Sequence, residues 1–322
     1  MMARGLQRRQ FGMLAAAAAA ATVLPARAET TRLRVSIIPI VDTAPLRVAV
    51  EKGYFAAEGL EIDTTPSAGG AAGLPALAAG QVQVCFSNLI SIVLGAAQGL
   101  GFEVIAGGVA TGDKTPDAAG LVAKKGSPIK TGKDTAGKRI AVNTRNGVLW
   151  LYAREWVRAT GGDPDQATYL EVPFPQMADA IRGDRVDMAF ITEPFLGAAL
   201  ASPDLELVGW PYNTVQKNIP VGMWASTKTY IAQNPAIIDK FVRALDKGTD
   251  WSTAHLGTDE WIRIVGETTR LAPDKVKAMH PPLFQKTVDP AGVDAVVARM
   301  KANKMIDANY DPRGLLYRTA VR

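Results

Sequence analysis

The sequence has little of the chemistry on which most hydrolases depend. Its 322 residues include one cysteine, Cys85, and two histidines, His255 and His280. A single cysteine excludes an internal disulfide bond and a cysteine cluster that could bind zinc. The histidines form no H-E-x-x-H motif, and no G-x-S-x-G element occurs. The sequence therefore lacks the residues that metal-dependent or triad-type hydrolysis needs.

A nucleotide-binding motif is also missing. The glycine-rich stretch "SAGGAAG", residues 67–73, is neither G-x-G-x-x-G nor followed by Lys-Ser or Lys-Thr. The nearest approach to a Walker lysine, Gly132-Lys133-Asp134, lacks the required hydroxyl. We therefore discount ATP binding and interpret the glycines as a loop that lets the backbone approach a small ligand.

The N-terminal alanine-rich run is too short, and wrongly flanked, for a membrane span. Residues 1–28 combine the pair Arg8-Arg9, this run, and Ala26 and Ala28 at A-x-A spacing. The pattern is typical of an export signal of the twin-arginine or Sec type, cleaved after Ala28. No cysteine follows to carry a lipid, so we expect a soluble periplasmic protein that is not a lipoprotein.

The positive charge of the whole chain is small and belongs mostly to this segment. The chain has 36 basic and 31 acidic side chains, and four of the arginines lie in residues 1–28. The predicted mature chain is therefore close to neutral, which indicates neither nucleic acid nor an anionic membrane as a partner. Its length suffices for one large domain or two lobes, and we expect a monomer.

Apolar segments rich in β-branched residues alternate with helical patterns from residue 33 to about residue 226. Several segments are apolar throughout, which is typical of strands buried on both faces of a parallel sheet. This alternation predicts an α/β fold. The predicted strands are residues 33–38, 60–64, 82–86, 103–106, 120–123, 139–142, 169–172, 188–191 and 205–209.

The last part of the chain has a different pattern. From Asn234 onward we expect no strands, because residues 235–255, 258–270 and 289–305 show amphipathic helical periodicity.

Earlier parts of the chain look duplicated. "VQVCFSN" at residues 82–88 aligns with "VDMAFIT" at residues 186–192, and the pattern of residues 33–62 parallels that of 139–172. These matches favour two lobes built on one plan.

Short polar corners follow the predicted strands. Ligands of parallel α/β sheets bind beyond the carboxyl ends of the strands, so these corners are candidate ligand-binding positions. Helix capping is the alternative for each corner, because Asp, Ser, Thr and Asn are the preferred N-cap residues. The two roles are compatible. The candidates are Asp42, Thr43, Ser67, Gly69, Ser87, Asn88, Thr144, Asn146, Thr192 and Glu193.

Two aromatic residues extend this set. Trp210 and Tyr212 stand beyond a predicted strand on either side of a proline, where an amphipathic ring can face a cleft. Trp150 and Phe195 lie within helical patterns, and we expect them in the core. The candidate site therefore holds twelve residues, and we expect neither a cofactor nor a metal ion in it.

Three of these stretches together resemble a known family. "IPIVDTAPLRVAVEKGYFAAEGLEI", then "ALAAGQVQVCFSN", and later "AIRGDRVDMAFITEPF" resemble, in this order, the NMT1/THI5-like (SsuA/TauA/NrtA-type) solute-binding proteins of ABC importers. The resemblance covers residues 33–226 well and the helical tail only by type. The family's cleft positions fall on the ten polar corner residues named above.

The resemblance implies a type II periplasmic-binding-protein fold, with two Rossmann-like lobes joined by a two-strand hinge. Lobe 1 would comprise residues 30–118 and 224–322, and lobe 2 would comprise residues 122–219. The hinges would lie near residues 119–122 and 219–224. It also implies that the lobes close on a small solute and that an ABC permease of the inner membrane recognises the closed form.

The ligand class stays open between two alternatives. Helix N-termini after Thr43, Asn88 and Asn146 favour a small organic anion, of sulfonate or carboxylate type. Asp42 and Glu193 instead suit a pyrimidine or another aromatic heterocycle that donates N–H groups. We favour the anion at this stage. A sensing subunit is a further alternative.

A biosynthetic enzyme of the THI5 type on the same fold is the competing function from another class. The resemblance implies that such enzymes use a cysteine-rich motif, a lysine that bears a cofactor and an active-site histidine. This sequence has neither the cysteine run nor a histidine among the corners. We therefore expect a binding protein rather than an enzyme.

Overall fold

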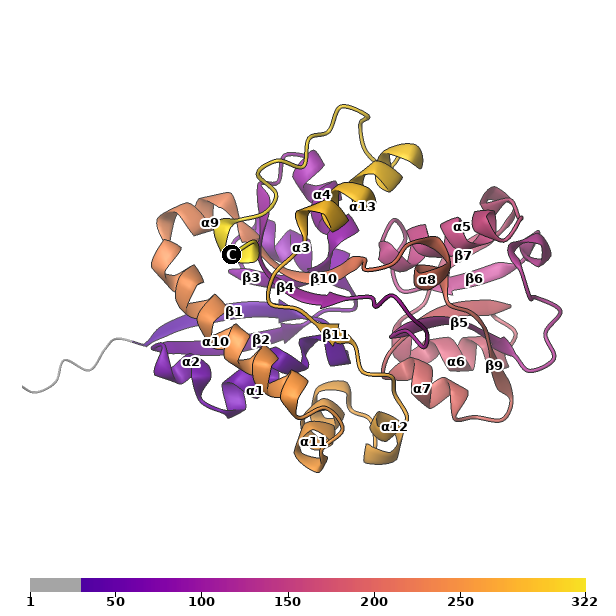
Figure 1. Cartoon of the computed structure of the whole chain (residues 1–322), viewed down its shortest axis with the longest axis horizontal. Coiled ribbons are helices and arrows are strands. Elements are labelled where there is room, and N and C mark those ends of the chain that lie inside the picture. Colours follow the sequence, from indigo (N-terminus) through magenta and orange to yellow (C-terminus); the bar gives the residue numbers. More distant parts are fainter. Residues whose placement is uncertain (1–29) are drawn as a thin grey trace, which may run out of the picture.

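The computed structural model describes residues 30–322. The predicted export signal, residues 1–28, lies outside the described residues. The described strands form one six-stranded and one five-stranded sheet, each covered by helices, and the two halves of the molecule lie side by side (Figure 1). No helix among residues 30–322 is long and apolar enough to cross a membrane.

The first sheet has the strand order β11-β4-β10-β3-β1-β2. Strand β1 pairs in parallel with β2 and β3, whereas β10 is antiparallel to both β3 and β4. β3 is buried along its whole length, as the apolar run of its sequence predicts. The strands are β1 (Thr31–Ile37), β2 (Leu60–Pro66), β3 (Val84–Asn88), β4 (Phe102–Ala110), β10 (Pro220–Thr227) and β11 (Leu283–Phe284).

The second sheet has the order β7-β6-β8-β5-β9. Strand β6 pairs in parallel with β7 and β8, and β5 lies antiparallel between β8 and β9. The second sheet therefore repeats the plan of the first, with β6, β7 and β8 in the places of β1, β2 and β3. These are the strands of the duplicated sequence patterns. Their bounds are β5 (Ala119–Lys124), β6 (Arg139–Val142), β7 (Thr168–Glu171), β8 (Met188–Thr192) and β9 (Leu205–Gly209).

All nine predicted strands are present, with ends shifted by up to four residues. The expectation that strands stop before Asn234 is wrong, because β11 pairs with β4 near the C-terminal end of the chain. A two-residue strand is too short to show a period of two, so its sequence carries no strand signal.

The helices lie against the faces of both sheets (Figure 1). In the C-terminal tail, α10 packs along α1 and α2, and α13 packs against α4, so the tail belongs to the half built on the first sheet. The helices are α1 (Ala44–Glu51), α2 (Tyr54–Ala57), α3 (Gly70–Ala78), α4 (Leu89–Ala97), α5 (Val148–Ala159), α6 (Phe174–Arg182), α7 (Phe195–Leu200), α8 (Pro211–Val215), α9 (Lys228–Gln233), α10 (Pro235–Ala254), α11 (Asp259–Thr269), α12 (Pro273–Lys277) and α13 (Pro290–Ala302).

Two segments connect the sheets, residues 111–118 and residues 210–219. They are tied to each other, because the Thr111 backbone N–H donates to the Ile219 carbonyl at 3.0 Å and the Ile219 N–H donates to the Thr111 hydroxyl at 2.9 Å. The expected hinge near residues 119–122 begins just after the first connection and lies within β5. The expected hinge near residues 219–224 begins at the last residue of the second connection and otherwise lies within β10. Whether each half moves as a rigid lobe stays a prediction.

Candidate ligand-binding site

A cavity of about 50 Å³ lies where the two halves and both connections meet. We call it the cleft cavity. With the halves in this arrangement its volume holds only a few water-sized groups, so a larger ligand would hold the halves further apart. The polar residues on its wall are Asp42, Asn88, Thr111, Asp117, Asn143, Thr192 and Tyr212, and the apolar ones are Ile38, Ile40, Phe86, Val109, Ala110, Ala118, Ala119, Val148, Leu149, Phe174, Val221, Gly222 and Pro282.

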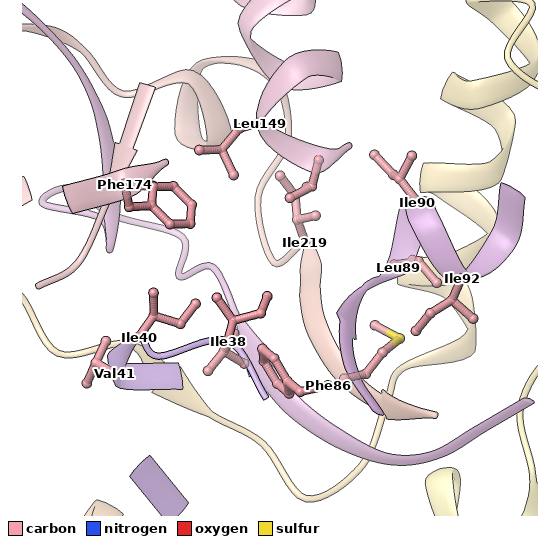
Figure 2. Packing of buried hydrophobic residues seen from close by; sticks show 14 of the residues in the cluster. Ile38, Ile40, Val41, Phe86, Leu89, Ile90, Ile92, Leu149, Phe174 and Ile219 are labelled. Carbon is pink, nitrogen blue, oxygen red and sulfur yellow. The ribbon is translucent and has the colours of Figure 1, made fainter. Parts of the chain in front are cut away.

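Both halves contribute apolar side chains to the wall. Figure 2 shows Ile38, Ile40 and Phe86 of the first half on one side, and Leu149 and Phe174 of the second half on the other. These residues come from strand ends and helix starts, which is where an α/β sheet presents its ligand-binding edge. Separation of the halves would therefore expose the cavity.

Asp42 lies on the wall directly before α1. Its side chain is buried, with 7% of the residue exposed, and its Oδ1 accepts no hydrogen bond from the described residues. Loss of hydration disfavours the charged carboxylate, so burial raises the pKa of Asp42 to about 7. The predicted candidate thus lines the cavity and has a buried acceptor without a partner within the described residues.

Thr43, its neighbour, faces elsewhere. The Thr43 hydroxyl donates to the carbonyls of Ile38 and Ile40, at 2.9 and 3.1 Å, and so closes the turn before α1. Thr43 lines a second, larger cavity of about 550 Å³ beside α1 and α11. Thr43 therefore stabilises the corner, while Asp42 points into the cleft cavity.

Ser67 and Gly69 stand at the next corner. The Ser67 hydroxyl is used within the corner, where it lies 3.2 Å from the carbonyls of Ile37 and Gly69. Gly69 contacts the other half of the molecule. A Cβ atom at Gly69 would lie 2.7 Å from the Thr144 hydroxyl and 3.1 Å from Asn143 Nδ2. Neither Ser67, Gly69 nor Thr144 lines the cavity, but the last two meet where the halves touch.

Asn88 both caps a helix and lines the cavity. Its Oδ1 accepts the Ser91 backbone N–H at 3.0 Å and its Nδ2 lies 3.0 Å from the Ser91 hydroxyl, which makes it the N-cap of α4. The capping alternative is therefore correct for Asn88. Ser87 is fully buried beside it, within the sheet.

At the Thr192-Glu193 corner, as at Asp42 and Thr43, one residue lines the cavity and its neighbour does not. Thr192 lines the cavity, and its hydroxyl donates to the Ala118 carbonyl at 3.1 Å. Glu193 is fully buried outside the cavity wall, where its carboxylate accepts the backbone N–H groups of Gly197 and His280, both at 2.9 Å. Burial raises the pKa of Glu193 above its ordinary value, against the opposing effect of these hydrogen bonds.

His280 corrects the expectation that no histidine stands at a corner. Its Nδ1 lies 3.2 Å from Glu193 Oε1, although the two residues are far apart in the sequence. The tail carries His280 across from the first half, past α12, to the start of α7. A sequence pattern cannot show such a contact, because it depends on where the tail returns.

The remaining candidates differ in position. Tyr212 is buried, lines the cavity and has a hydroxyl with no partner among the described residues. Trp210 does not line the cavity and meets the His280 ring edge-on at 6.1 Å. Asn146 is exposed and has a left-handed backbone, with φ of 57°. Thus Asp42, Asn88, Thr192 and Tyr212 line the cleft cavity, and the other eight candidates do not.

Asp117 is the wall residue that sequence reasoning missed. It lies in the first connection, 5% exposed, with its Oδ1 accepting the Ala118 N–H at 2.7 Å and its Oδ2 unpaired within the described residues. Burial raises its pKa to about 6. Thr111 lies in the same connection, and Phe174 and Asn143 follow strands of the second sheet. The signal available for Asp117 was its place just before a predicted strand.

The sequence matches the NMT1/THI5-like family over residues 41–256. The chain belongs to this family. It is 26% identical, over 78% of its length, to the nitrate/nitrite binding protein NrtA of Nostoc sp. and 30% identical, over 72%, to the riboflavin-binding protein RibY of Chloroflexus aurantiacus. The chain spans 61% and 66% of the lengths of these two relatives.

Solved structures of low sequence identity share the architecture. The alkanesulfonate-binding protein SsuA from Xanthomonas axonopodis pv. citri, bound to MOPS, superposes with a TM-score of 0.75 over 90% of this chain and 99% of its own, at 15% identity. The predicted α/β fold of the periplasmic-binding-protein type is therefore confirmed. Which of the wall residues contact a ligand stays a prediction.

Proposed function

We propose that this member of the NMT1/THI5-like family is the extracytoplasmic solute-binding protein of an ABC importer. One observation carries the proposal: a cavity between two similar halves presents buried polar atoms that the protein itself leaves unpaired. Such atoms are costly unless a ligand or water pairs with them. The names of the relatives, which bind nitrate or nitrite and riboflavin, support a binding role.

The mechanism is closure of two lobes around the solute. Lobe 1, residues 30–118 with 224–322, and lobe 2, residues 122–219, would turn about the two connections that Thr111 and Ile219 hold together. A ligand that touches Asp42 and Asn88 on one side and Thr192 on the other binds only the closed form well, and so shifts the equilibrium towards it. A permease in the inner membrane would receive the closed monomer from the periplasm.

The cavity favours the second of the two ligand classes predicted from the sequence. Its wall holds two aspartates and no lysine or arginine, so a heterocycle with N–H donors fits it better than an organic anion. One observation keeps a small anion as the second candidate ligand. Arg47 and Arg270 line the larger cavity near Thr43, where a sulfonate or nitrate could pair with them.

An enzymatic role of the THI5 type has less support than a binding role. Cys85 is buried within the first sheet, and burial raises the pKa of its thiol to about 12, which leaves no reactive thiolate at neutral pH. His280 touches Glu193, and neither residue lines the cleft cavity.

Ligand-induced closure can be tested by two measurements on one compound panel of nitrogen heterocycles, amines, sulfonates, carboxylates, nitrate and flavins. A ligand at a hundredfold excess over its Kd should stabilise the protein by about 2.7 kcal/mol, which raises the melting temperature by several degrees. The same compound should reduce the radius of gyration in small-angle X-ray scattering. Stabilisation without compaction would contradict closure, and no stabilisation by any class would contradict the binding role.

A further inference from the structure

Two buried carboxyl groups face one small cavity from different parts of the chain. Asp42 precedes α1 in the first half, and Asp117 lies in the first connection. Asp42 Oδ1 and Asp117 Oδ2 both have no hydrogen-bond partner among the described residues, and the Tyr212 hydroxyl on the same wall has none either. Three buried oxygen atoms on wall residues of one cavity therefore lack a hydrogen-bond partner within the described part of the protein.

The cavity contains no protein cation to neutralise these groups. None of its twenty wall residues is a lysine, an arginine or a histidine. An unpaired carboxylate in apolar surroundings costs several kcal/mol, so such groups are normally paired with a cation or protonated. Because the protein supplies no cation, each carboxyl is either protonated or paired with a positive charge that comes with the ligand.

Aromatic rings complete the wall. Phe86 of the first half, Phe174 of the second half and Tyr212 of the second connection all line the cavity. The face of an aromatic ring attracts a cation, and this attraction grows when water is excluded. A hydrated metal ion would not suit this wall, because Mg²⁺ and Ca²⁺ require six or more oxygen ligands.

We propose that the cleft cavity binds a small organic cation whose N–H groups donate to Asp42 and Asp117, such as an amidinium or a protonated amino-heterocycle. This inference rests on the proposed function and specifies its ligand class. Asp42 belongs to the first half and Asp117 to the connection between the halves, so a cation between them would join the two as the cleft closes. The aromatic rings would lie against its flat faces.

The electrostatics of the cavity agree with this assignment. Burial raises the pKa of both carboxyls, to about 7 for Asp42 and about 6 for Asp117. The pKa of Tyr212 is raised well above its ordinary value by burial first, and then by the charges of Asp117, of the neighbouring Tyr152 and of Asp42. Tyr212 therefore lies close enough to both carboxyls to be affected by their charge, which a monocation beside them would offset.

The test compares compounds of one shape and three charges. Benzamidine, benzamide and benzoate share a phenyl ring and carry a positive, neutral and negative head group. Isothermal titration of the full chain at pH 8, where both carboxyls are ionised, should give at least tenfold tighter binding of benzamidine than of benzamide, and no binding of benzoate. 4-Aminopyridine should likewise bind more tightly than pyridine. The inference is overturned if neither series shows tighter binding of the cation.

Two variants locate the effect. Asp42→Asn and Asp117→Asn keep the shape of the side chain and remove its charge, and each should weaken benzamidine binding at least tenfold. Asp259→Asn is the matched control, because this carboxyl lies on the surface of α11 with 98% of its side chain exposed, and it should leave the affinity unchanged. Circular dichroism checks that each variant is folded. Unchanged affinity in both cavity variants would overturn the inference.

The two proposals fail in different ways. If an anion such as MOPS or nitrate compacts the protein in small-angle scattering while the cations do not bind, the ligand class is wrong and the binding function stands. If benzamidine binds without compaction and the aspartate variants still weaken it, the cation site stands and the closure mechanism fails.

Discussion

Asp42 should make the stability of the ligand-free protein depend on pH. Its pKa is about 7 in the folded protein, whereas an unfolded chain has the ordinary value near 3.8. The folded state therefore holds a proton that the unfolded state has lost, and stability falls as pH rises from about 4 to about 7. A shift of this size corresponds to about 4 kcal/mol. Asp117 adds to the same trend up to about pH 6.

The measurement is the melting temperature of the ligand-free protein between pH 5 and pH 8. We expect it to fall by several degrees over this range, and Asp42→Asn should make the slope clearly shallower because the amide does not titrate. The exposed Asp259→Asn variant should keep the wild-type slope. An equal slope in Asp42→Asn would mean that this carboxyl is already hydrated or paired in the folded protein.

The same residue shows how far sequence reasoning reached into the site. The rule that ligands meet the carboxyl ends of strands led to Asp42, Asn88, Thr192 and Tyr212, which do line the cavity. It failed to separate Asp42 from Thr43, because the direction of a side chain depends on the turn that carries it. Asp117 was missed because the connections have no periodicity to interpret.

Helix α3 begins where the two halves touch, and its N-cap residue, Gly69, should control closure. The Gly69 backbone is extended, so alanine is tolerated there without strain. Its Cβ atom would nevertheless lie 2.7 Å from the Thr144 hydroxyl in the other half. Gly69→Ala should therefore obstruct the closed form and leave each half intact, which predicts a roughly tenfold loss of ligand affinity.

Thermal melting and titration together distinguish obstruction from misfolding. The ligand-free Gly69→Ala protein should melt within about one degree of the wild type, because the change is tolerated inside the first half. Thr144→Ala removes the obstructing hydroxyl and should restore most of the affinity in the double variant. Failure of this rescue would show that Gly69 acts within α3 rather than across the cleft.

The strands and helices themselves were predictable for a simple reason. Strands such as β3 and β8 are buried on both faces, so their sequences are apolar up to the polar residues at their carboxyl ends. The tail helices show the amphipathic pattern of one buried face. Strand β10 was predicted only as part of the hinge near residues 219–224, because its Pro220 and Gly222 interrupt the apolar pattern. Whether such a segment forms a strand depends on its pairing with distant segments, which a local pattern does not show.

Across the whole molecule, the C-terminal tail joins the two halves at two places outside the cavity. His280 meets Glu193 at the start of α7, as described above. On α13, Arg299 pairs with Glu155 of α5 at 2.5 Å, and Asn303 Nδ2 donates to the same carboxylate at 3.1 Å. Both contacts exist only while the halves lie together, so they add to the free energy of closure.

Removal of the Arg299 charge should therefore shift the molecule towards the open form without touching the cavity. Glu155 is 10% exposed and Arg299 is 25% exposed, a setting in which one ion pair is worth about 1–3 kcal/mol. Arg299→Met keeps much of the side-chain packing on Tyr152 and loses the ion pair. A loss of about 1.4 kcal/mol would lower the closed population, and with it the ligand affinity, up to tenfold.

Arg263→Met is the matched control, because Arg263 pairs with Glu51 and Glu267 entirely within the first half. Small-angle scattering of the ligand-free Arg299→Met protein should show a larger radius of gyration than the control, with equal radii once ligand is saturating. Because α13 does not line the cleft cavity, Arg299 makes no direct contact with a ligand bound there. Equal radii for the two ligand-free variants would show that the Glu155 contact follows closure rather than favouring it.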